Sequence, residues 1–586
     1  MDVGFEIQME NMFHTAYFVV KKDKSFSDFP DLVELNRRTG SNMPKSYLSD
    51  KACARFIVDI YDGEMEKLLA NLKKARFISI MIDGATDVGN LENEIIYIKF
   101  FDKEKGVVQS FFGIEDVKHA NADGIIAAVD SVFQQAGMEN WRDCVVFLCA
   151  DGAAVNMGRK NAVAAKLKEN IEHLLAIHCV AHRLELGMVD SIKDDAQLKK
   201  LQEVLQFLYQ QYHYSPKALR ELRMLAQALE EKVLKPTNPR GARWLPYIHK
   251  ATKILCTSYA VFVAHFEDQI SPERTPQPSA AVLGRAKNIL KYLKCHKNVQ
   301  FMHFMCDTLD LLKTMSLQFQ QNDLIPGEAV EYLEVCVSGL TELSLQPGEQ
   351  HAKMLTDAEA GVFKGVELSN VSEGTLDSER KRITNTLITH IESRLGDLST
   401  QSLVAKFHAL DHHNWPSGED FILHGQLDVE ALCRHYQAIL QREWTSSSEV
   451  MAEYRLCKVW AKNRKGPLRE TLQEILQRDD LMKKYKGLSI LAQIYLSASR
   501  PATAACERGF SCMKRVKNDW RSSLATSQLN RLMFLSIEGP SLETFDAKRA
   551  VLRWWGSGPR SRKPGFTSRV NQPTEDEMEE ELIELE

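Results

Sequence analysis

Two aspartates in this chain each follow a run of apolar residues that has the character of a buried strand. Asp83 ends the run at residues 77–82, and Asp151 follows the run at 145–148 after two small side chains. Side chains at strand ends converge on a crevice, and hard divalent cations prefer carboxylate oxygens. Two such cations can activate a water molecule and stabilise a leaving phosphate oxygen. The pair therefore indicates metal-dependent phosphate chemistry, whereas either aspartate alone is more simply a helix cap or a turn residue.

A complete site of this kind needs a third carboxylate. Glu507 is the candidate, because it lies just inside an expected helix whose apolar stripe could hold it against a sheet. The stripe consists of Cys506, Phe510, Met513 and Trp520. An ordinary surface position on a helix is the alternative for Glu507, and only a family resemblance decides against it. Asp87, four residues after Asp83, is the second choice for the ligand that the first strand supplies.

The elements that must position these acids form a mixed α/β pattern. Apolar runs indicate strands at 77–82, 94–101, 107–114, 145–148 and 174–177, with a hairpin turn at 102–106 and an amphipathic helix at 122–137. Three strands, a helix and two more strands are typical of one mixed sheet, not of repeated βαβ units. From residue 179 onward the pattern is almost wholly helical. The first and fourth strands of such a sheet can lie side by side, which would bring Asp83 and Asp151 together.

Composition describes an ordinary globular protein of more than one domain. The chain has 586 residues, of which 44% are hydrophobic and 26% charged, and its formal net charge is -5. This length exceeds one compact core, and the acidic balance means that any nucleic-acid-binding basic surface must be local. The 12 cysteines form no paired framework, which favours reduced thiols in a cytosolic or nuclear compartment. No apolar run is long enough to span a bilayer, so no membrane partner is expected.

Five ordered motifs resemble those of the hAT superfamily of DNA transposases. Residues 82–87 (IDGATD) and 151–157 (DGAAVNM) are similar to the first two acid motifs, and residues 179–184 (CVAHRL) are similar to the Cys-x-x-His pair. Arg243-Trp244 resembles the Arg-Trp motif, and residues 501–535 resemble the C-terminal dimerisation region that holds the third acid. Each motif alone is weak, but five in the family's order are specific. The chain looks most like the domesticated branch that includes zinc finger protein 862-like proteins.

The resemblance implies an α/β fold, in which an RNase H-like mixed sheet is interrupted by a large all-α insertion domain. The implied parts are an N-terminal helical segment (1–75), the first part of the core (76–246), the insertion (247–485), a dimerisation region that completes the core (486–545), and an acidic tail expected to be disordered (546–586). It also implies two-metal DNA cleavage and transfer by Asp83, Asp151 and Glu507, with Mg²⁺ or Mn²⁺ as the cofactor. The chain starts after the position of the family's zinc finger, so recognition of transposon ends is expected to be missing or supplied by another protein.

The remaining motifs have both functional and structural interpretations. Cys179 and His182 have the spacing of half a zinc site, but with no second pair nearby we favour a buried cysteine and a hydrogen-bonded histidine near the active site. Trp244 could stack on an unpaired base and Arg243 could bind a phosphate, although composition alone favours a core tryptophan. Two C-terminal helices carry more apolar surface than one core needs, and the resemblance raises dimerisation above core packing. The dimerisation candidates are Phe510, Leu529, Leu532 and Met533.

Two hypotheses for the function follow. In the first, the chain is a domesticated hAT transposase-like protein of the nucleus that binds DNA, forms a homodimer or higher oligomer, and retains residual strand cleavage or transfer. In the second, it is a non-catalytic nuclear scaffold or transcription regulator that keeps only the fold and dimerisation. The three acids favour the first hypothesis for the chemistry, whereas the expected lack of a zinc finger and the acidic net charge favour the second for the biological role.

Overall fold

The chain folds into two compact units. The computed structural model describes residues 3–240, 244–320, 326–358, 361–371, 376–395, 403–498 and 504–557. One unit combines Met1–Cys179 with Lys406–Glu586, and the other is Val180–Ala405. We call them the sheet unit and the helical unit. The helical unit therefore interrupts the sheet unit along the sequence, while the finer domain boundaries expected from the sequence stay predictions.

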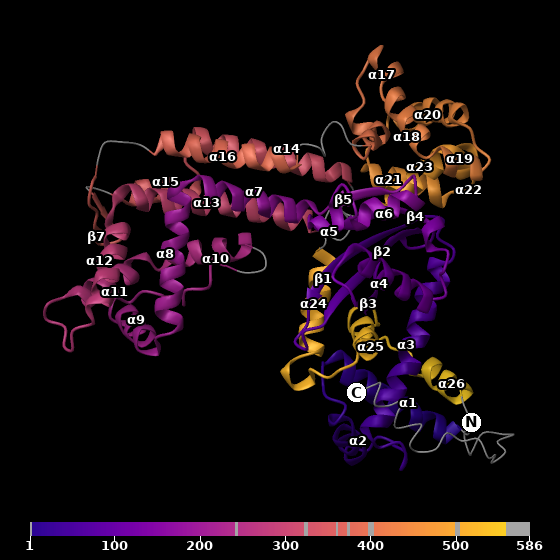
Figure 1. Cartoon of the computed structure of the whole chain (residues 1–586), viewed down its shortest axis with the longest axis horizontal. Helices are drawn as coiled ribbons and strands as arrows, with labels where there is room; N and C mark the ends of the chain where they lie inside the picture. The colour runs from indigo at the N-terminus through magenta and orange to yellow at the C-terminus, as the bar shows by residue number, and fades with distance from the viewer. Residues whose placement is uncertain are drawn as a thin grey trace. The chain divides into compact units, whose positions relative to one another are not determined.

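The sheet unit is built on a five-stranded mixed sheet with the order β3-β2-β1-β4-β5 (Figure 1). The strands are β1 (Ile78–Thr86), β2 (Glu92–Asp102), β3 (Gly106–Asp116), β4 (Val145–Ala150) and β5 (Leu175–His178). The β1–β2 and β2–β3 pairs are antiparallel, whereas the β1–β4 and β4–β5 pairs are parallel. This topology confirms the predicted fold class, an RNase H-like mixed α/β sheet interrupted by a large helical insertion.

Each face of the sheet packs against its own layer of helices, because side chains alternate along a strand. The face that carries the isoleucines of β1 packs against α4 (Ala122–Gln135) and α6 (Val163–Asn170). The opposite face, which carries Met81, packs against α24 (Ala504–Val516) and α25 (Thr526–Ile537). Although α24 comes from the far end of the chain, it contacts both β1 and β2 and lies beside them in Figure 1.

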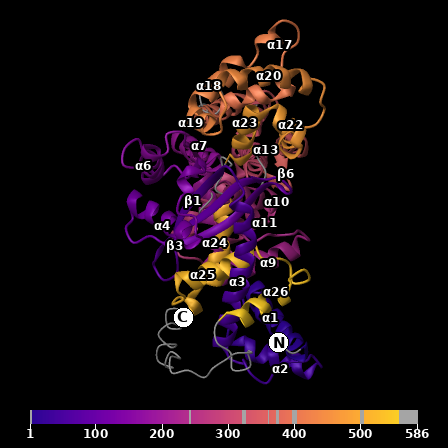
Figure 2. The same cartoon turned by 90° about the vertical axis from the view of Figure 1, so that its right-hand side faces the viewer.

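Helices from the two ends of the chain also pack together. The helices α1 (Val3–Lys21), α3 (Asp50–Leu72) and α26 (Ala547–Gly556) contact one another, and Figure 2 shows the indigo N-terminal helices beside the yellow α26. The rings of Trp554 and Phe56 lie 5.9 Å apart in this contact. Aromatic pairs of this kind contribute about 0.5–1.5 kcal/mol beyond their buried area. The C-terminal part of the sheet unit is thereby fixed to its N-terminal helices.

The other elements are helices and a short ladder. In the sheet unit they are α2 (Asp28–Arg38), η1 (Trp141–Asp143), α5 (Ala154–Met157), η5 (His412–Asn414), α17 (Asp420–Leu423), α18 (Gln426–His435), α19 (Gln437–Arg442), α20 (Ser447–Ala461), α21 (Leu468–Gln477), α22 (Asp479–Lys484), α23 (Lys486–Ser497) and η6 (Asp519–Arg521), with η4 (Ala405–Leu410) at the boundary between the units. In the helical unit they are α7 (Val180–Asp194), α8 (Ala196–His213), α9 (Pro216–Ala228), α10 (Trp244–Thr257), α11 (Tyr259–Ile270), α12 (Ala280–Lys294), α13 (His296–Phe319), α14 (Pro326–Leu345), α15 (Glu349–Asp357), β6 (Val362–Phe363), β7 (Val366–Glu367) and α16 (Asp377–Leu395). Among the helices of the described residues, none has the length and apolarity that crossing a bilayer requires.

Two buried histidines make the helical unit sensitive to acid. Burial lowers the pKa of His303 on α13 to about 4. Burial likewise lowers the pKa of His351 on α15 to about 4, with the charges of Arg380 and His303 acting in the same direction. The unfolded chain titrates near the ordinary value of about 6.5. Between these pH values the unfolded state binds more protons than the folded state, so stability falls as the pH drops below 6.5.

We expect each of these histidines to cost the helical unit about 2 kcal/mol of stability at pH 5 relative to pH 7.5. Replacing His303 and His351 by glutamine should remove the part of the pH-dependent stability that these two histidines contribute. Urea unfolding of the full chain at the two pH values, followed by hydrogen exchange in α13 and α15, measures the effect. The exposed His213→Gln is the matched control. An unchanged pH dependence in the double variant would contradict the assignment.

Candidate metal-dependent active site

The register of the sheet brings the first two predicted acids to neighbouring positions. β1 and β4 run parallel, with Met81 opposite Cys149. Continuing this register by two residues puts Asp83 opposite Asp151, the first residue after β4. Neighbouring strands lie about 4.8 Å apart, so side chains on one face at matching positions can reach the same ion. Both aspartates are partly exposed, which leaves them accessible from solvent.

Local contacts fix the orientation of Asp151. Its Oδ1 accepts hydrogen bonds from the backbone N–H of Ala153 at 3.1 Å and from Nδ2 of Asn156 at 2.8 Å. The next residue, Gly152, leaves room for the ring of His178, because a Cβ at Gly152 would lie 2.1 Å from Cε1 of that histidine. A larger residue at this position would displace either the imidazole or the loop that carries the aspartate. The loop is therefore held in one conformation at the end of β4.

The helix that carries Glu507 packs on the strand that carries Asp83. α24 contacts β1 and β2, and Gly509 permits the approach, because a Cβ there would lie 3.1 Å from Cδ1 of Ile95. Burial raises the pKa of the Cys506 thiol, and the charge of Asp83 raises it further, so the start of α24 lies near the first acid. Glu507 itself is partly exposed. The fold thus gathers the elements that carry the three predicted acids.

The chemistry of the three acids suits hard divalent cations. Carboxylates can be shared by two cations, which lie about 3.5–4 Å apart in a two-metal site. The donors are all carboxylate oxygens, which is the chemistry that Mg²⁺ and Mn²⁺ require.

Glu94 is an acid of this region that sequence reasoning missed. It lies on β2 opposite Gly84, is 2% exposed, and lines one pocket of about 260 Å³ together with Asp151. Burial raises the pKa of Glu94, and the charges of Asp83 and Asp151 raise it further. Its Oε1 has no hydrogen-bond partner among the described residues. The only signal in the sequence is a glutamate at the start of an apolar strand, where an exposed residue is the ordinary expectation.

Replacing Glu94 by glutamine should stabilise the chain when divalent cations are removed by EDTA. Because the pKa of Glu94 is raised, the folded state holds a proton that the unfolded state releases, and the wild type loses stability as the pH rises above the ordinary carboxyl value. The advantage of Glu94→Gln should therefore grow from pH 5 to pH 8 in urea unfolding. Glu104→Gln, at the exposed β2–β3 turn, is the control. An advantage that does not change with pH would refute this interpretation.

Asp87, the second choice for a metal ligand on the first strand, is engaged in a buried ion pair. Its Oδ2 lies 2.8 Å from Nζ of Lys517, and both side chains are 1% exposed. The same oxygen accepts a hydrogen bond from Nδ2 of Asn93 at 3.0 Å, and Oδ1 accepts from the N–H groups of Gly89 and Leu91. This carboxylate has its hydrogen-bonding capacity filled by the protein. Since Lys517 directly follows α24, the pair ties that helix to the β1–β2 hairpin.

The other predicted site residues lie in different parts of the chain. Cys179 is 2% exposed, and its N–H donates to the carbonyl of Ala150 at 2.9 Å, which extends β5 along β4. His182 lies in the first turn of α7 in the helical unit. Trp244 begins α10 in that unit, and its backbone N–H donates to Oε2 of Glu185 at 3.2 Å. Arg243 falls outside the described residues. The roles of these residues near the active site and in DNA binding stay predictions.

The side chains predicted for dimerisation lie largely inside the sheet unit. Leu529, Leu532 and Met533 of α25 are buried in the core formed with α1, α3 and α26, and Phe510 packs partly buried against the same core. The apolar stripe of α25 is therefore filled by the chain's own helices, which the sequence pattern could not reveal. The dimer and the part of these four residues in it stay predictions.

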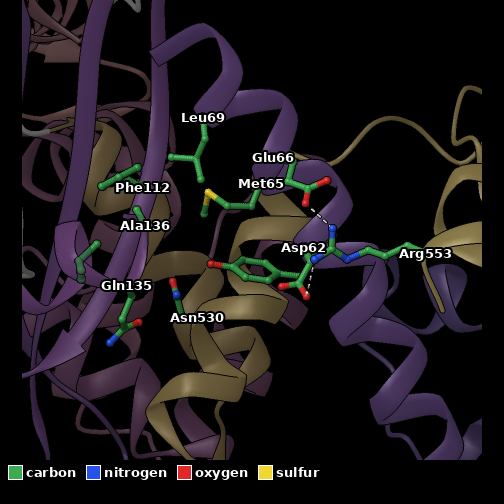
Figure 3. Close-up of a pocket in the computed structure, with 11 residues that line it drawn as sticks. Asp62, Met65, Glu66, Leu69, Phe112, Gln135, Ala136, Asn530 and Arg553 are labelled. Atoms are coloured by element: carbon green, nitrogen blue, oxygen red, sulfur yellow. Dashed lines mark hydrogen bonds and ion pairs between the residues drawn. The ribbon is translucent and has the colours of Figure 1, made fainter. Parts of the chain in front are cut away.

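A second pocket of the sheet unit has a structural explanation. It encloses about 210 Å³ among α3, α4, α25 and α26 (Figure 3). Its arginine, Arg553, is already paired with two carboxylates, since one nitrogen lies 3.3 Å from Oδ2 of Asp62 and another pairs with Glu66. Burial raises the pKa of Asp62, and Arg553 opposes that rise. These ion pairs join α26 to α3. The packing of the helices therefore accounts for the charged groups that line the pocket.

The topology defines an RNase H-like α/β protein, and the neighbouring strand ends that carry Asp83 and Asp151 form its candidate metal-dependent site. Residues 41–159 match the family model DUF4371, described as the RNase-like domain of ZMYM1/FAM200. The matched segment contains Asp83, Glu94 and Asp151, whereas Glu507 lies beyond it. This similarity fits a protein derived from a domesticated transposase, which is the coarser form of the family predicted from the sequence.

Proposed function

We propose that this chain is a domesticated hAT transposase-like protein that binds DNA and cleaves or transfers DNA strands with two divalent cations. The observation that carries the proposal is the parallel register of β1 and β4, which leads Asp83 and Asp151 to neighbouring strand ends. The packing of α24, the helix that carries Glu507, on β1 supports a role for this third acid. The family similarity of residues 41–159 agrees with an origin in a transposase.

In this proposal the protein's own groups bind and orient the reacting phosphate. Asp83, Asp151 and Glu507 would hold Mg²⁺ or Mn²⁺, which lowers the pKa of a water molecule and stabilises charge on the leaving oxygen. The hydrogen bonds from Ala153 and Asn156 keep the carboxylate of Asp151 aimed in one direction, so no reorientation is needed during the reaction. Arg243 would bind a DNA phosphate, and Trp244 would stack on an unpaired base.

The proposal extends to assembly and location. We expect a homodimer or higher oligomer formed through the region 486–545, and a nuclear location in keeping with a DNA substrate. Since the apolar side chains of α25 are buried, other residues of this region would make the contact. Trp520 on η6 is 96% exposed, and large exposed aromatic side chains are common anchors of protein interfaces.

The test is DNA cleavage by the purified full-length chain. A labelled branched or hairpin-forming DNA is incubated with Mg²⁺ or Mn²⁺, with EDTA as the control. We expect cleavage products that depend on the divalent cation and that disappear in EDTA. DNA binding without any cleavage would remove the catalytic part of the proposal.

A non-catalytic nuclear scaffold or transcription regulator is the second candidate. The observation in its favour is that the three acids do not form one close cluster among the described residues, together with the net charge of -5. In that case the chain would bind partners and form oligomers without metal-dependent chemistry. Light scattering and DNA-binding measurements on a chain that shows no cleavage would support this candidate.

A further inference from the structure

A turn of the sheet unit, far along the sequence from the three acids, brings together a carboxylate and two imidazoles. Asp411, His412 and His413 each offer a donor atom, and these atoms all lie within 4.8 Å of one another. Oδ1 of Asp411 lies 3.2 Å from Nδ1 of His413, and the centroids of the two histidine rings lie 4.2 Å apart. Three donors of two chemical types therefore lie close together in one turn.

The turn that carries these residues is fixed from several sides. Asp411 caps η5, because its Oδ1 accepts from the N–H of His413 at 3.1 Å and its Oδ2 accepts from Nδ2 of Asn414 at 3.1 Å. The carbonyl of Ala409 accepts from Nε1 of Trp415 at 2.9 Å and from the hydroxyl of Tyr454 at 2.8 Å, so α20 anchors the turn. A ligand set on a rigid turn loses little conformational entropy when it binds an ion.

Helix capping explains the position of Asp411, but it does not explain the burial of His412. This histidine is 7% exposed, and although the backbone of Gly466 lies near its ring, neither ring nitrogen makes a hydrogen bond of good geometry within the described residues. A buried polar group without a partner costs about 1–3 kcal/mol. A neutral imidazole nitrogen in such a position can bind a metal ion.

We infer that Asp411, His412 and His413 bind a divalent transition-metal ion of the Zn²⁺ class, with a further coordination position left for water or a partner's ligand. Two imidazoles and one carboxylate are a ligand set for catalytic zinc, and imidazole does not suit Mg²⁺. Donors of a tetrahedral zinc site lie about 3.4 Å apart, given metal–ligand bonds of about 2.1 Å. The pair Asp411–His413 already has this spacing, and His413 reaches the surface with 47% of its side chain exposed. This site does not depend on the proposed function, since it shares no ligand with the acids of the sheet.

Zinc titration of the full-length chain tests the inference. After removal of metals by EDTA and dialysis, calorimetry with Zn²⁺ should reveal a site that is weakened at least about tenfold in His412→Ala and in His413→Ala. Because His413 is half exposed, its variant should fold normally, which circular dichroism checks. Asp151→Asn and the exposed His213→Ala are controls that should leave this site unchanged.

Two results would overturn the inference. One is a zinc isotherm that is the same for the wild type and His413→Ala, which would mean that any zinc is bound by other groups, such as the cysteines. The other is a wild type that binds no zinc with micromolar or better affinity. Substitution by Co²⁺ adds a spectroscopic check, because the ligand-field absorption of the bound ion should disappear in both histidine variants.

Discussion

Replacing Asp151 by asparagine should reduce metal-dependent DNA cleavage about a thousandfold, while the chain stays folded. Loss of a carboxylate ligand removes several kcal/mol of transition-state stabilisation, and about 4 kcal/mol corresponds to a thousandfold in rate. Asparagine keeps an Oδ1 that can still accept from the N–H of Ala153 and from Asn156, so the loop after β4 should keep its conformation. The measurement is the single-turnover cleavage rate in saturating Mn²⁺.

The matched control for this variant is Asp143→Asn. Asp143 lies at the opposite end of β4, is exposed, and is far along the strand from the proposed ions. Its variant should cleave DNA at the wild-type rate. If Asp151→Asn retains more than a tenth of the activity, Asp151 does not bind a catalytic ion. Equal thermal unfolding of both variants would establish that the comparison concerns chemistry and not folding.

The strands were predictable because each carries an unbroken signal. β4 is apolar at every position, and β1 is apolar up to Asp83 except at Ser79, so their type and order follow from local sequence. The pairing of β1 with β4 also follows, because mixed sheets of this order admit few arrangements. The change to helices after residue 179 was visible in the sequence, whereas the start of the insertion at 247 came from the family resemblance. The helix α7 begins directly after β5 and Cys179 without any turn residue that would mark a boundary between units.

The acids also differ in how far local sequence could identify them. Asp83 and Asp151 follow their own strands, so the sequence alone could pair them. Glu507 became a candidate only through a family resemblance, because its approach to β1 depends on tertiary packing of α24. Glu94 could not be distinguished from an exposed strand residue, since its burial results from the pocket shared with Asp151. Patterns in the local sequence, however strong, do not predict contacts between segments that are far apart along the chain.

Replacing Lys517 by methionine should destabilise the sheet unit by about 3–5 kcal/mol, because it leaves the carboxylate of Asp87 buried without a countercharge. Both side chains are 1% exposed, so water cannot replace the lost partner. Burial opposes ionisation of Asp87, but the hydrogen bonds from Lys517, Leu91 and Asn93 outweigh it and lower the pKa of Asp87. The carboxylate is therefore charged at pH 7, and the variant should show the full free-energy cost of a buried charge without a partner. Urea unfolding of the full chain at pH 7 measures it.

The double variant Asp87→Asn/Lys517→Met separates the cost of an unpaired charge from the loss of the contact itself. Removing both charges should recover part of the stability lost in Lys517→Met, since a neutral pair leaves no uncompensated ion. Lys514→Met, at an exposed position of α24, should change stability by less than about 0.5 kcal/mol. If the single variant costs no more than this control, the pair does not hold α24 against β1. If the pair does hold the helix, the Lys517→Met variant should show a larger acceleration of hydrogen exchange in α24 than in α4. The reason is that this ion pair connects α24, and not α4, to the sheet.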